Sequence, residues 1–459
     1  MDSPDLVFAG AAEQARLLAA GTVRAPDLVE LYLDRIARID SEIRSYRVVL
    51  AESARQEAAA AQARLDAGER LPLLGVPIAI KDDTDVAGQL TTYGGAGHGP
   101  AKTVDAEVVT RLRAAGAVIL GKTAVPELMI WPFTETVAFG AVRNPWNTDY
   151  TPGGSSGGSG ASVAAGLAAL ALGSDGAGSI RIPSTWCGLF GVKPQRDRVP
   201  MTPLDDEWCG MCVNGPLART VEDAALFLDV TAPGENFVAA AARAPGRLRI
   251  ALSTAVPPTL VARVGRAQQA AVHQAGMLLR ELGHDVIVRD PDYPRWAVYG
   301  HVLPRYFRGI YDDAKALARP DLLDSRSRGM ARIGGLISDR RIASIRAREP
   351  ELAARIGSIF DDVDVLITPG TAAGPSKIGA YRKLGAVATL ARVAARVPFQ
   401  AAFNATGQPA AVVPWGLDDN GVPLSLQLVS RPFDEATLLS LSAQIESARP
   451  WKHRRPPSH

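Results

Sequence analysis

The stretch from residue 152 to residue 193 reads PGGSSGGSGASVAAGLAALALGSDGAGSIRIPSTWCGLFGVK, and the rest of the chain is organised around it. Residues 150–174 carry no charge, although 21% of the chain is charged. Two Gly/Ser-rich turns, which contain Ser155 and Ser179, flank an apolar, alanine-rich run. This pattern predicts a turn, a buried helix and a second turn, with the helix setting the spacing of the two serines.

Composition indicates a globular protein with a large core. The chain has 459 residues and 47% hydrophobic content, which suits one large α/β domain or two to three smaller ones. A net charge of +2 gives no sign of a nucleic-acid or anionic-membrane partner. The uncharged run is too rich in Gly and Ser for a membrane span, and the acidic start MDSPDLVFAG does not suit a signal peptide. We therefore expect a cytoplasmic protein with no nucleic-acid and no membrane partner.

The three cysteines are sparse and odd in number. Cys187, Cys209 and Cys212 therefore argue against a disulfide framework and favour a reducing compartment. Cys209 and Cys212 form a CxxC pair, but no further ligands lie close to it in sequence. We expect small buried side chains and no metal site.

Alternation of helical and strand-like runs predicts an α/β fold. Strand-like runs end at Lys81 and at residue 121, and others lie at 247–254, 284–290, 362–370, 409–416 and 423–430. Helical periodicity covers residues 11–66, 105–116 and 264–283. We therefore expect one domain over residues 1–459, with a mixed, twisted β-sheet covered by helices on both faces.

Two motifs match by letter but fail on physical grounds. Residues 116–123 fit the P-loop pattern GxxxxGK[ST], but their middle is a strand-like apolar run and not a phosphate-binding loop. Residues 153–157 fit the nucleophile elbow GxSxG, but the preceding NPWNTDYTP cannot form the strand that this elbow follows. Nucleotide binding and a Ser-His-Asp hydrolase are therefore not expected.

After these two exclusions, the remaining catalytic arrangement is a serine nucleophile with a lysine as its base. A serine hydroxyl needs a base, and burial lowers the pKa of an ammonium group, so Lys81 is a candidate after the apolar run GVPIAI. Spacing alone leaves open that Lys81 is a solvated lysine at a strand end. Ser179 follows a Gly-Ala-Gly turn whose N–H groups suit an oxyanion hole, although the same residues also suit an ordinary tight turn.

Several long motifs in order resemble the amidase signature family. They are PLLGVPIAIKDDTDVAG, DAEVVTRLRAAGAVILGKTAVPE, TETVAFGAVRNPWN, the serine-rich segment itself, GPLARTVEDAALFLDV, FNATGQPAAVVP and LSLQLVSRPFDEATLL. The resemblance implies a Ser–cis-Ser–Lys triad, with Ser179 as nucleophile, Ser155 as relay after a cis Gly154–Ser155 peptide, and Lys81 as base. It also implies an oxyanion hole made by the backbone N–H groups of Gly176, Ala177, Gly178 and Ser179.

The chain departs from the family pattern at three positions. Ala177 replaces the usual first glycine of the turn and keeps its N–H in place if its φ is negative. Asp83 stands where asparagine is common, and a carboxylate there would favour a charged Lys81, so its side chain is expected to point away or to be screened. Ala124 replaces a frequent asparagine and is expected to lie outside direct contact with substrate.

The resemblance also implies an activity. It implies an amidohydrolase that cleaves a C–N bond through a seryl acyl-enzyme, with water as acyl acceptor and without a cofactor. The catalytic core is expected in residues 65–200, and the segment 296–358 is expected to be helical and to cover the substrate. Trp131 and Phe133 occupy a loop that lines the acyl pocket in relatives. They are therefore expected either to line an apolar or aryl substrate pocket or to pack in the core.

Three alternatives stay open. They are a carbamate or ester hydrolase with the same triad, the A subunit of a glutamine-dependent tRNA amidotransferase, and a catalytically dead binding scaffold. The partner is expected to be a small-molecule amide or carbamate. The oligomeric state stays open, with a homodimer among the options.

Overall fold

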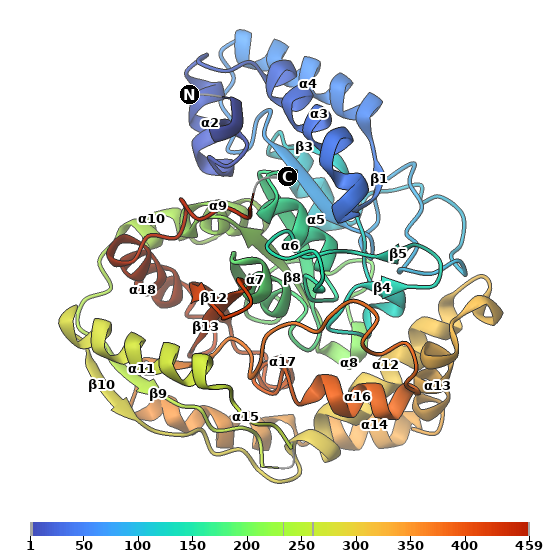
Figure 1. Cartoon of the computed structure of the whole chain (residues 1–459), viewed down its shortest axis with the longest axis vertical. Coiled ribbons are helices and arrows are strands. Elements are labelled where there is room, and N and C mark those ends of the chain that lie inside the picture. The colour runs from blue at the N-terminus through green and yellow to red at the C-terminus, as the bar shows by residue number, and fades with distance from the viewer. Residues whose placement is uncertain (1–2, 233, 259–260, 458–459) are drawn as a thin grey trace.

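The central element of the fold is an 11-stranded β-sheet (Figure 1). The computed structural model describes residues 3–232, 234–258 and 261–457. In spatial order the strands are β1 (Tyr46–Val49), β3 (Val118–Thr123), β2 (Pro77–Lys81), β6 (Leu170–Asp175), β8 (Val213–Ala218), β7 (Phe190–Lys193), β12 (Ala410–Leu417), β13 (Pro423–Ser430), β11 (Val365–Pro369), β9 (Arg249–Leu252) and β10 (Asp285–Val288). A separate two-stranded ribbon pairs β4 (Glu135–Thr136) with β5 (Gly140–Ala141).

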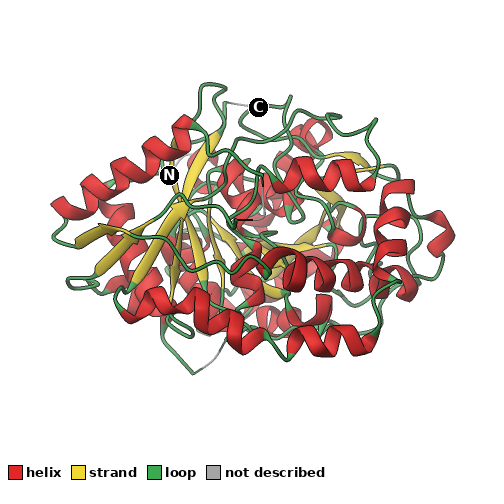
Figure 2. Cartoon of the chain, turned by 90° about the horizontal axis from the view of Figure 1, so that it is seen from below, coloured by secondary structure: helices red, strands yellow, loops and turns green. Residues whose placement is uncertain are grey.

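The sheet is mixed, as the sequence predicts. β2 runs parallel to both β3 and β6, and β9, β10 and β11 are parallel neighbours at the other end. The strands between β6 and β11 pair antiparallel. Every residue of β2, β3, β6, β8, β11 and β13 is buried, because helices cover both faces of the twisted sheet (Figure 2).

Helices form the two outer layers. Their bounds are α1 (Ser3–Leu6), α2 (Ala11–Ala19), α3 (Ala25–Ile43), α4 (Ala51–Asp66), α5 (Glu107–Ala114), α6 (Gly157–Ala164), α7 (Arg181–Cys187), α8 (Glu207–Gly210), α9 (Val221–Thr231), α10 (Phe237–Ala242), α11 (Arg266–Glu281), α12 (Leu303–Ala316), α13 (Ser325–Gly334), α14 (Asp339–Arg346), α15 (Glu349–Gly357), α16 (Ala386–Ala394), α17 (Ala401–Ala405) and α18 (Glu435–Ala448). Short helical turns are η1 (Glu127–Met129), η2 (Ala297–Val302), η3 (Pro320–Leu322) and η4 (Ser358–Asp361).

The buried stripe of α3 illustrates why these segments are helical. Leu28, Tyr32, Ile36 and Ile43 lie on one face and are buried, and a proline occupies the first turn, where its missing N–H costs nothing. The main core joins residues from both ends of the chain, from Val7 to Trp451. It therefore agrees with one domain built on one sheet.

A second, smaller core lies beside the site. It is built by residues 125–133, by Trp208 and by side chains from α12, α13 and α16. In Figure 1 these three helices lie at the opposite end of the molecule from α3 and α4. The segment 296–358, which the sequence predicts to be helical, contains η2, α12 to α15 and the short turns among them.

The sequence missed several strands. The segment predicted as turn, helix and turn contains α6 and then β6, so a helix and a strand together separate Ser155 from Ser179. β6 reads LALGSD, which has little intrinsic strand preference, and its place between two buried neighbours selects the extended form. The segment predicted as helical over residues 11–66 is interrupted by β1, and β7 and β8 were also not predicted. No helix in the described ranges is long and apolar enough to cross a bilayer.

Candidate active site

Lys81 lies at the end of β2 with a fully buried side chain. Its Nζ donates to Ser155 Oγ at 2.8 Å and to Ser174 Oγ at 2.6 Å. It also forms an ion pair with Asp83 Oδ2 at 2.8 Å. Burial and these three partners rule out the alternative of a solvated strand-end lysine.

The expectation that Asp83 points away from Lys81 is wrong. After β2 the chain turns, with the Thr84 N–H donating to the Lys81 carbonyl at 3.1 Å, and this turn folds the Asp83 side chain back onto the ammonium group. Burial raises the pKa of Asp83, but the charge of Lys81 and three hydrogen bonds outweigh burial and hold that pKa below its ordinary value. Asp83 is therefore an anion in direct contact with the candidate base.

The two catalytic-serine candidates lie on adjacent loops. Ser155 follows a cis Gly154–Ser155 peptide and precedes α6, and Ser179 precedes α7. The Ser156 N–H donates to the Ser179 carbonyl at 3.2 Å and joins the two loops. In the described part of the chain, no hydrogen bond links Ser155 Oγ with Ser179 Oγ, so of the expected relay only the Lys81–Ser155 hydrogen bond is formed.

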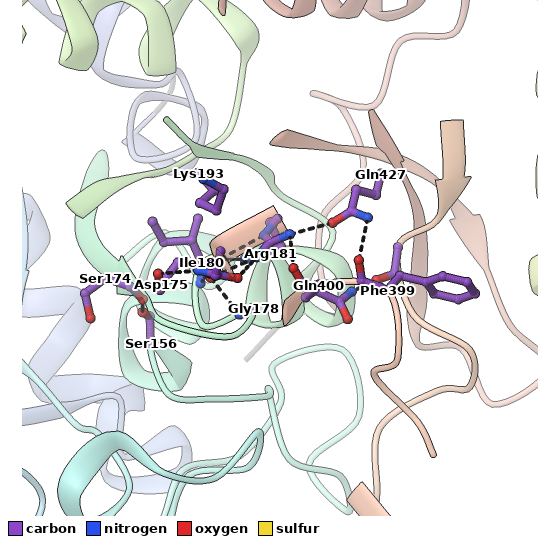
Figure 3. A network of polar contacts seen from close by, with 12 residues as sticks. Ser156, Ser174, Asp175, Gly178, Ile180, Arg181, Lys193, Phe399, Gln400 and Gln427 are labelled. Carbon is purple, nitrogen blue, oxygen red and sulfur yellow. Dashed lines mark hydrogen bonds and ion pairs between the residues drawn. The ribbon is translucent and has the colours of Figure 1, made fainter. Parts of the chain in front are cut away.

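Asp175 organises the turn that carries Ser179 (Figure 3). Its carboxylate accepts from the N–H groups of Gly178 at 2.6 Å and Ile180 at 3.1 Å, and from the Arg181 guanidinium at 2.9 and 3.0 Å. Burial raises the pKa of Asp175, but the charge of Arg181 and its hydrogen bonds outweigh burial, so the pKa lies below its ordinary value. Asp175 is therefore ionised and holds the turn between β6 and α7 in one conformation.

Arg181 ties this turn to the C-terminal part of the chain. Its guanidinium donates to Gln427 Oε1 at 2.8 Å, to the Gln400 carbonyl at 3.1 Å and to Asn404 Oδ1 at 2.5 Å. The sequence analysis missed this network. The available signal was that Asp175 and Arg181 are the first two charged residues after the uncharged run.

Three of the four expected oxyanion donors are available. The N–H groups of Gly176, Ala177 and Ser179 donate to no other described residue. The Gly178 N–H is directed to Asp175 instead, so the expectation that it belongs to the hole is corrected. Ala177 is not among the residues with positive φ, which meets the condition for a non-glycine residue there, whereas Gly178 has a φ of 120°.

Ser179 lies on the wall of an apolar cavity. Gly154, Ala177 and Trp131 line it on the catalytic side. The cavity is also lined by Val298, Leu303, Tyr306, Leu390 and Val393, among others, and among the residues that the structure describes no charged side chain contributes to the lining. The cavity therefore suits an uncharged, apolar group next to the Ser179 hydroxyl.

The sequence predicted this lining only in part. Trp131 lines the cavity, but Phe133 does not, because its ring stacks behind Trp131 and against Tyr381, with centroids 5.7 Å and 4.8 Å away. The helical segment 296–358 contributes only from residue 297 to residue 306. Helices α16 and α17 supply further lining residues that the sequence analysis did not single out.

The other sequence motifs lie outside this chemistry. Lys122 of the P-loop-like motif is in strand β3, buried and paired with Asp82 at 2.9 Å. Burial raises the pKa of Cys209 to about 11 and that of Cys212 well above its ordinary value. Within the described ranges, no group of three or more His, Cys, Asp or Glu side chains is placed to hold a metal ion.

Comparisons with known proteins agree over nearly the whole chain. The family model Amidase matches residues 27–439. The Mycobacterium tuberculosis protein named "Putative amidase AmiB2" is 68% identical over an alignment of 460 positions that covers 99% of each chain. The structure of 6-aminohexanoate cyclic dimer hydrolase with substrate superimposes with a TM-score of 0.88 at 31% identity, covering 98% of this chain and 99% of that chain. A bacterial aryl acylamidase of the amidase signature family gives a TM-score of 0.85 at 25% identity, over 96% of each chain.

Proposed function

The chain belongs to the amidase signature family and is an amide-hydrolysing enzyme, and from this premise we propose that it cleaves small, uncharged, apolar or aryl amides through a seryl acyl-enzyme. The observation that carries the proposal is the position of Ser179 on the wall of a cavity without charged side chains. Burial of a charged substrate group there would be unfavourable, because no opposite charge is available to pair with it.

The proposed reaction begins with a proton relay. Lys81 in its free-base form takes a proton from Ser155, which takes one from Ser179, and Ser179 Oγ attacks the substrate carbonyl. The developing oxyanion is stabilised by the N–H groups of Gly176, Ala177 and Ser179, and removal of one such donor typically lowers the rate by about 10²–10³-fold.

The acyl-enzyme then forms and is hydrolysed. Ser155 passes a proton to the substrate nitrogen, the C–N bond breaks, and the amine or ammonia leaves. Water attacks the ester on Ser179 while its proton passes through Ser155 to Lys81. The C–O bond to Ser179 then breaks, Ser179 Oγ regains a proton from Lys81 through Ser155, and the acid product leaves as a carboxylate after losing its proton to water. Each proton that is taken up is returned, so the triad is unchanged at the end of the cycle.

The cavity favours uncharged, apolar amides over the charged amino acid glutamine as substrate. Glutamine carries an α-carboxylate and an α-ammonium group, and no charged side chain lines the cavity to pair with either. The two structural relatives are named for a cyclic 6-aminohexanoate dimer and for aryl acyl amides, and neither name denotes glutamine. A carbamate or ester hydrolase with the same triad is the alternative that this cavity also accommodates.

One activity panel tests the proposal. Anilides, short aliphatic amides, carbamates, p-nitrophenyl esters and glutamine are compared, with Ser179→Ala and the control Ser162→Ala. Ser162 is also buried, but its hydroxyl donates only to the Ser159 carbonyl within α6. We expect the fastest turnover with anilides or apolar amides, at least about 10⁴-fold loss in Ser179→Ala, and nearly full activity in Ser162→Ala. Near-full activity of Ser179→Ala, or glutamine as the preferred substrate, would contradict the proposal.

A further inference from the structure

We propose that Asp83 is a positioning residue that holds Lys81 as an ammonium ion and so raises the pH at which the enzyme becomes active. The inference rests on the proposed function, because it assigns Lys81 the role of base. The structure places the Asp83 carboxylate in direct contact with Lys81 Nζ, at 2.8 Å.

The contacts of Lys81 Nζ match those of an ammonium ion. An ammonium group has three N–H donors, and the Nζ atom has three oxygen partners, Ser155 Oγ, Ser174 Oγ and Asp83 Oδ2, all within 2.8 Å. Asp83 Oδ2 has no proton to give, so it takes one N–H of Lys81, and its negative charge favours the ammonium form over a neutral amine, whose lone pair would accept from a serine hydroxyl. The Ser174 hydroxyl donates to Asp83 Oδ2 at 2.6 Å, and the Thr84 hydroxyl donates to Asp83 Oδ1 at 3.1 Å. The carboxylate is therefore held in place by two neighbours besides Lys81.

Burial makes this ion pair effective. The side chain of Lys81 is 0% exposed and that of Asp83 is 4% exposed, so water screens their attraction weakly. Two further carboxylates, Glu207 and Asp313, lie within electrostatic range of Asp83. Burial raises the pKa of Glu207 well above its ordinary value and that of Asp313 to about 7. Of the three carboxylates, Asp83 is therefore the one next to Lys81 that is ionised at neutral pH.

The remaining titratable neighbours do not replace this charge. Cys212 and Tyr93 face the same region, and burial raises the pKa of each, so both are neutral near pH 7. The Asp82 carboxylate comes next in the chain but pairs with Lys122 at 2.9 Å and with Arg47 at 2.7 Å. These charges form a separate buried cluster, because the Asp82 carboxylate has two cations of its own to pair with.

The consequence for catalysis is a pH requirement. Lys81 accepts the proton of Ser155 only after its ammonium group has released one proton to water. The negative charge of Asp83 opposes that release, so activity rises with pH until the ammonium form is lost. In general, an opposite charge in direct contact moves the titration midpoint of its partner by about 1–3 pH units.

Asp83→Asn removes the charge and keeps the size of the side chain. The control is Asp85→Asn, because Asp85 is buried in the same loop but pairs with Lys102 at 3.1 Å and accepts from Thr91. Lysines labelled with ¹³C at Cε report the protonation of Lys81 directly by NMR in the intact protein, and the Lys81 signal is identified by its loss in Lys81→Arg. We expect the Lys81 midpoint of Asp83→Asn to lie about 1–3 pH units below that of the wild-type protein, with no change in Asp85→Asn.

A second measurement connects the charge to the nucleophile. The rate at which a fluorophosphonate labels Ser179 is followed against pH, and its acid limb is expected to move by the same amount as the NMR midpoint. Equal NMR midpoints in Asp83→Asn and wild type would overturn the inference, as would an NMR shift without a shift of the labelling profile. If the fluorophosphonate does not label Ser179 of the wild-type protein at any of the pH values, the proposed function is contradicted. The NMR midpoints would still decide the role of Asp83 in that case. Asp83→Ser, measured in the same way, replaces Asp83→Asn if that variant does not fold.

Discussion

Substitution of Asp175 by Asn is expected to destabilise the protein strongly. Asp175 and Arg181 are both fully buried, and two guanidinium nitrogens lie 2.9 and 3.0 Å from the carboxylate. In Asp175→Asn the guanidinium keeps only uncharged partners, among them Gln427 and Asn404. An uncompensated buried charge of this kind costs about 3–5 kcal/mol. The turn that carries Ser179 loses its anchor in the same variant, so the rate of phosphonylation of Ser179 is expected to fall as well.

The assay compares this variant with an exposed pair of the same chemistry. Arg247 and Asp285 lie 2.6 Å apart, but their side chains are 72% and 50% exposed, so Asp285→Asn is expected to change stability far less than Asp175→Asn. Urea unfolding at pH 7, followed by tryptophan fluorescence and circular dichroism, gives the free energy of unfolding for each variant. The double variant Asp175→Asn with Arg181→Met removes the unpaired charge and is expected to recover part of the loss. A loss in Asp175→Asn no larger than in Asp285→Asn would refute the reasoning.

Four further predictions follow from the same contacts. Trp131→Ala enlarges the cavity next to Ser179 and is expected to raise KM for an anilide by about tenfold, whereas an unchanged KM would place the substrate elsewhere. Gly178→Ala is expected to abolish labelling of the nucleophile, because its Cβ would lie 2.7 Å from Ile182 Cδ1 at a φ of 120°, and normal labelling would contradict this. Burial raises the pKa of Glu446 to about 7, so the folded state binds the extra proton and loses stability as pH rises from about 4.5 to about 7. Glu446→Gln should therefore flatten urea midpoints over this range, and an unchanged slope would count against it. Because the raised pKa keeps Cys209 a thiol, iodoacetamide at pH 8 should modify it slowly in the folded protein, and rapid stoichiometric modification would argue against its burial.

The sequence predicted the ends of strands and turns better than the middle of the uncharged run. The strand that ends at Lys81 was predicted because β-branched residues precede it and a polar turn follows. Strand β6 was missed because Leu, Ala and Gly in its sequence suit a buried helix equally well. Its extended form is decided by hydrogen bonds to β2 and β8, whose partner residues lie far away in the sequence.

The distant parts of the site carried no local signal. Leu390 and Val393 line the cavity more than 200 residues after Ser179, and as parts of an amphipathic helix they resemble ordinary core residues. Arg181 finds its partners Asn404 and Gln427 on two other elements of the C-terminal region. Such contacts follow from how the sheet and its helices assemble, so they cannot be predicted from the order of residues along the chain.

The serine-rich stretch by itself predicted the two turns that carry Ser155 and Ser179, because glycine-rich turns and an apolar run are local properties, and its resemblance to the amidase signature family predicted the class of chemistry. Tertiary structure alone decided three other features. The Gly178 N–H donates to the Asp175 carboxylate instead of taking part in the expected oxyanion hole. The tertiary structure turned Asp83 onto Lys81, against the expectation from its charge, because the turn after β2 directs that side chain inward. It also placed Phe133 behind Trp131, since side-chain direction is set by packing against Tyr381 and not by the order of residues.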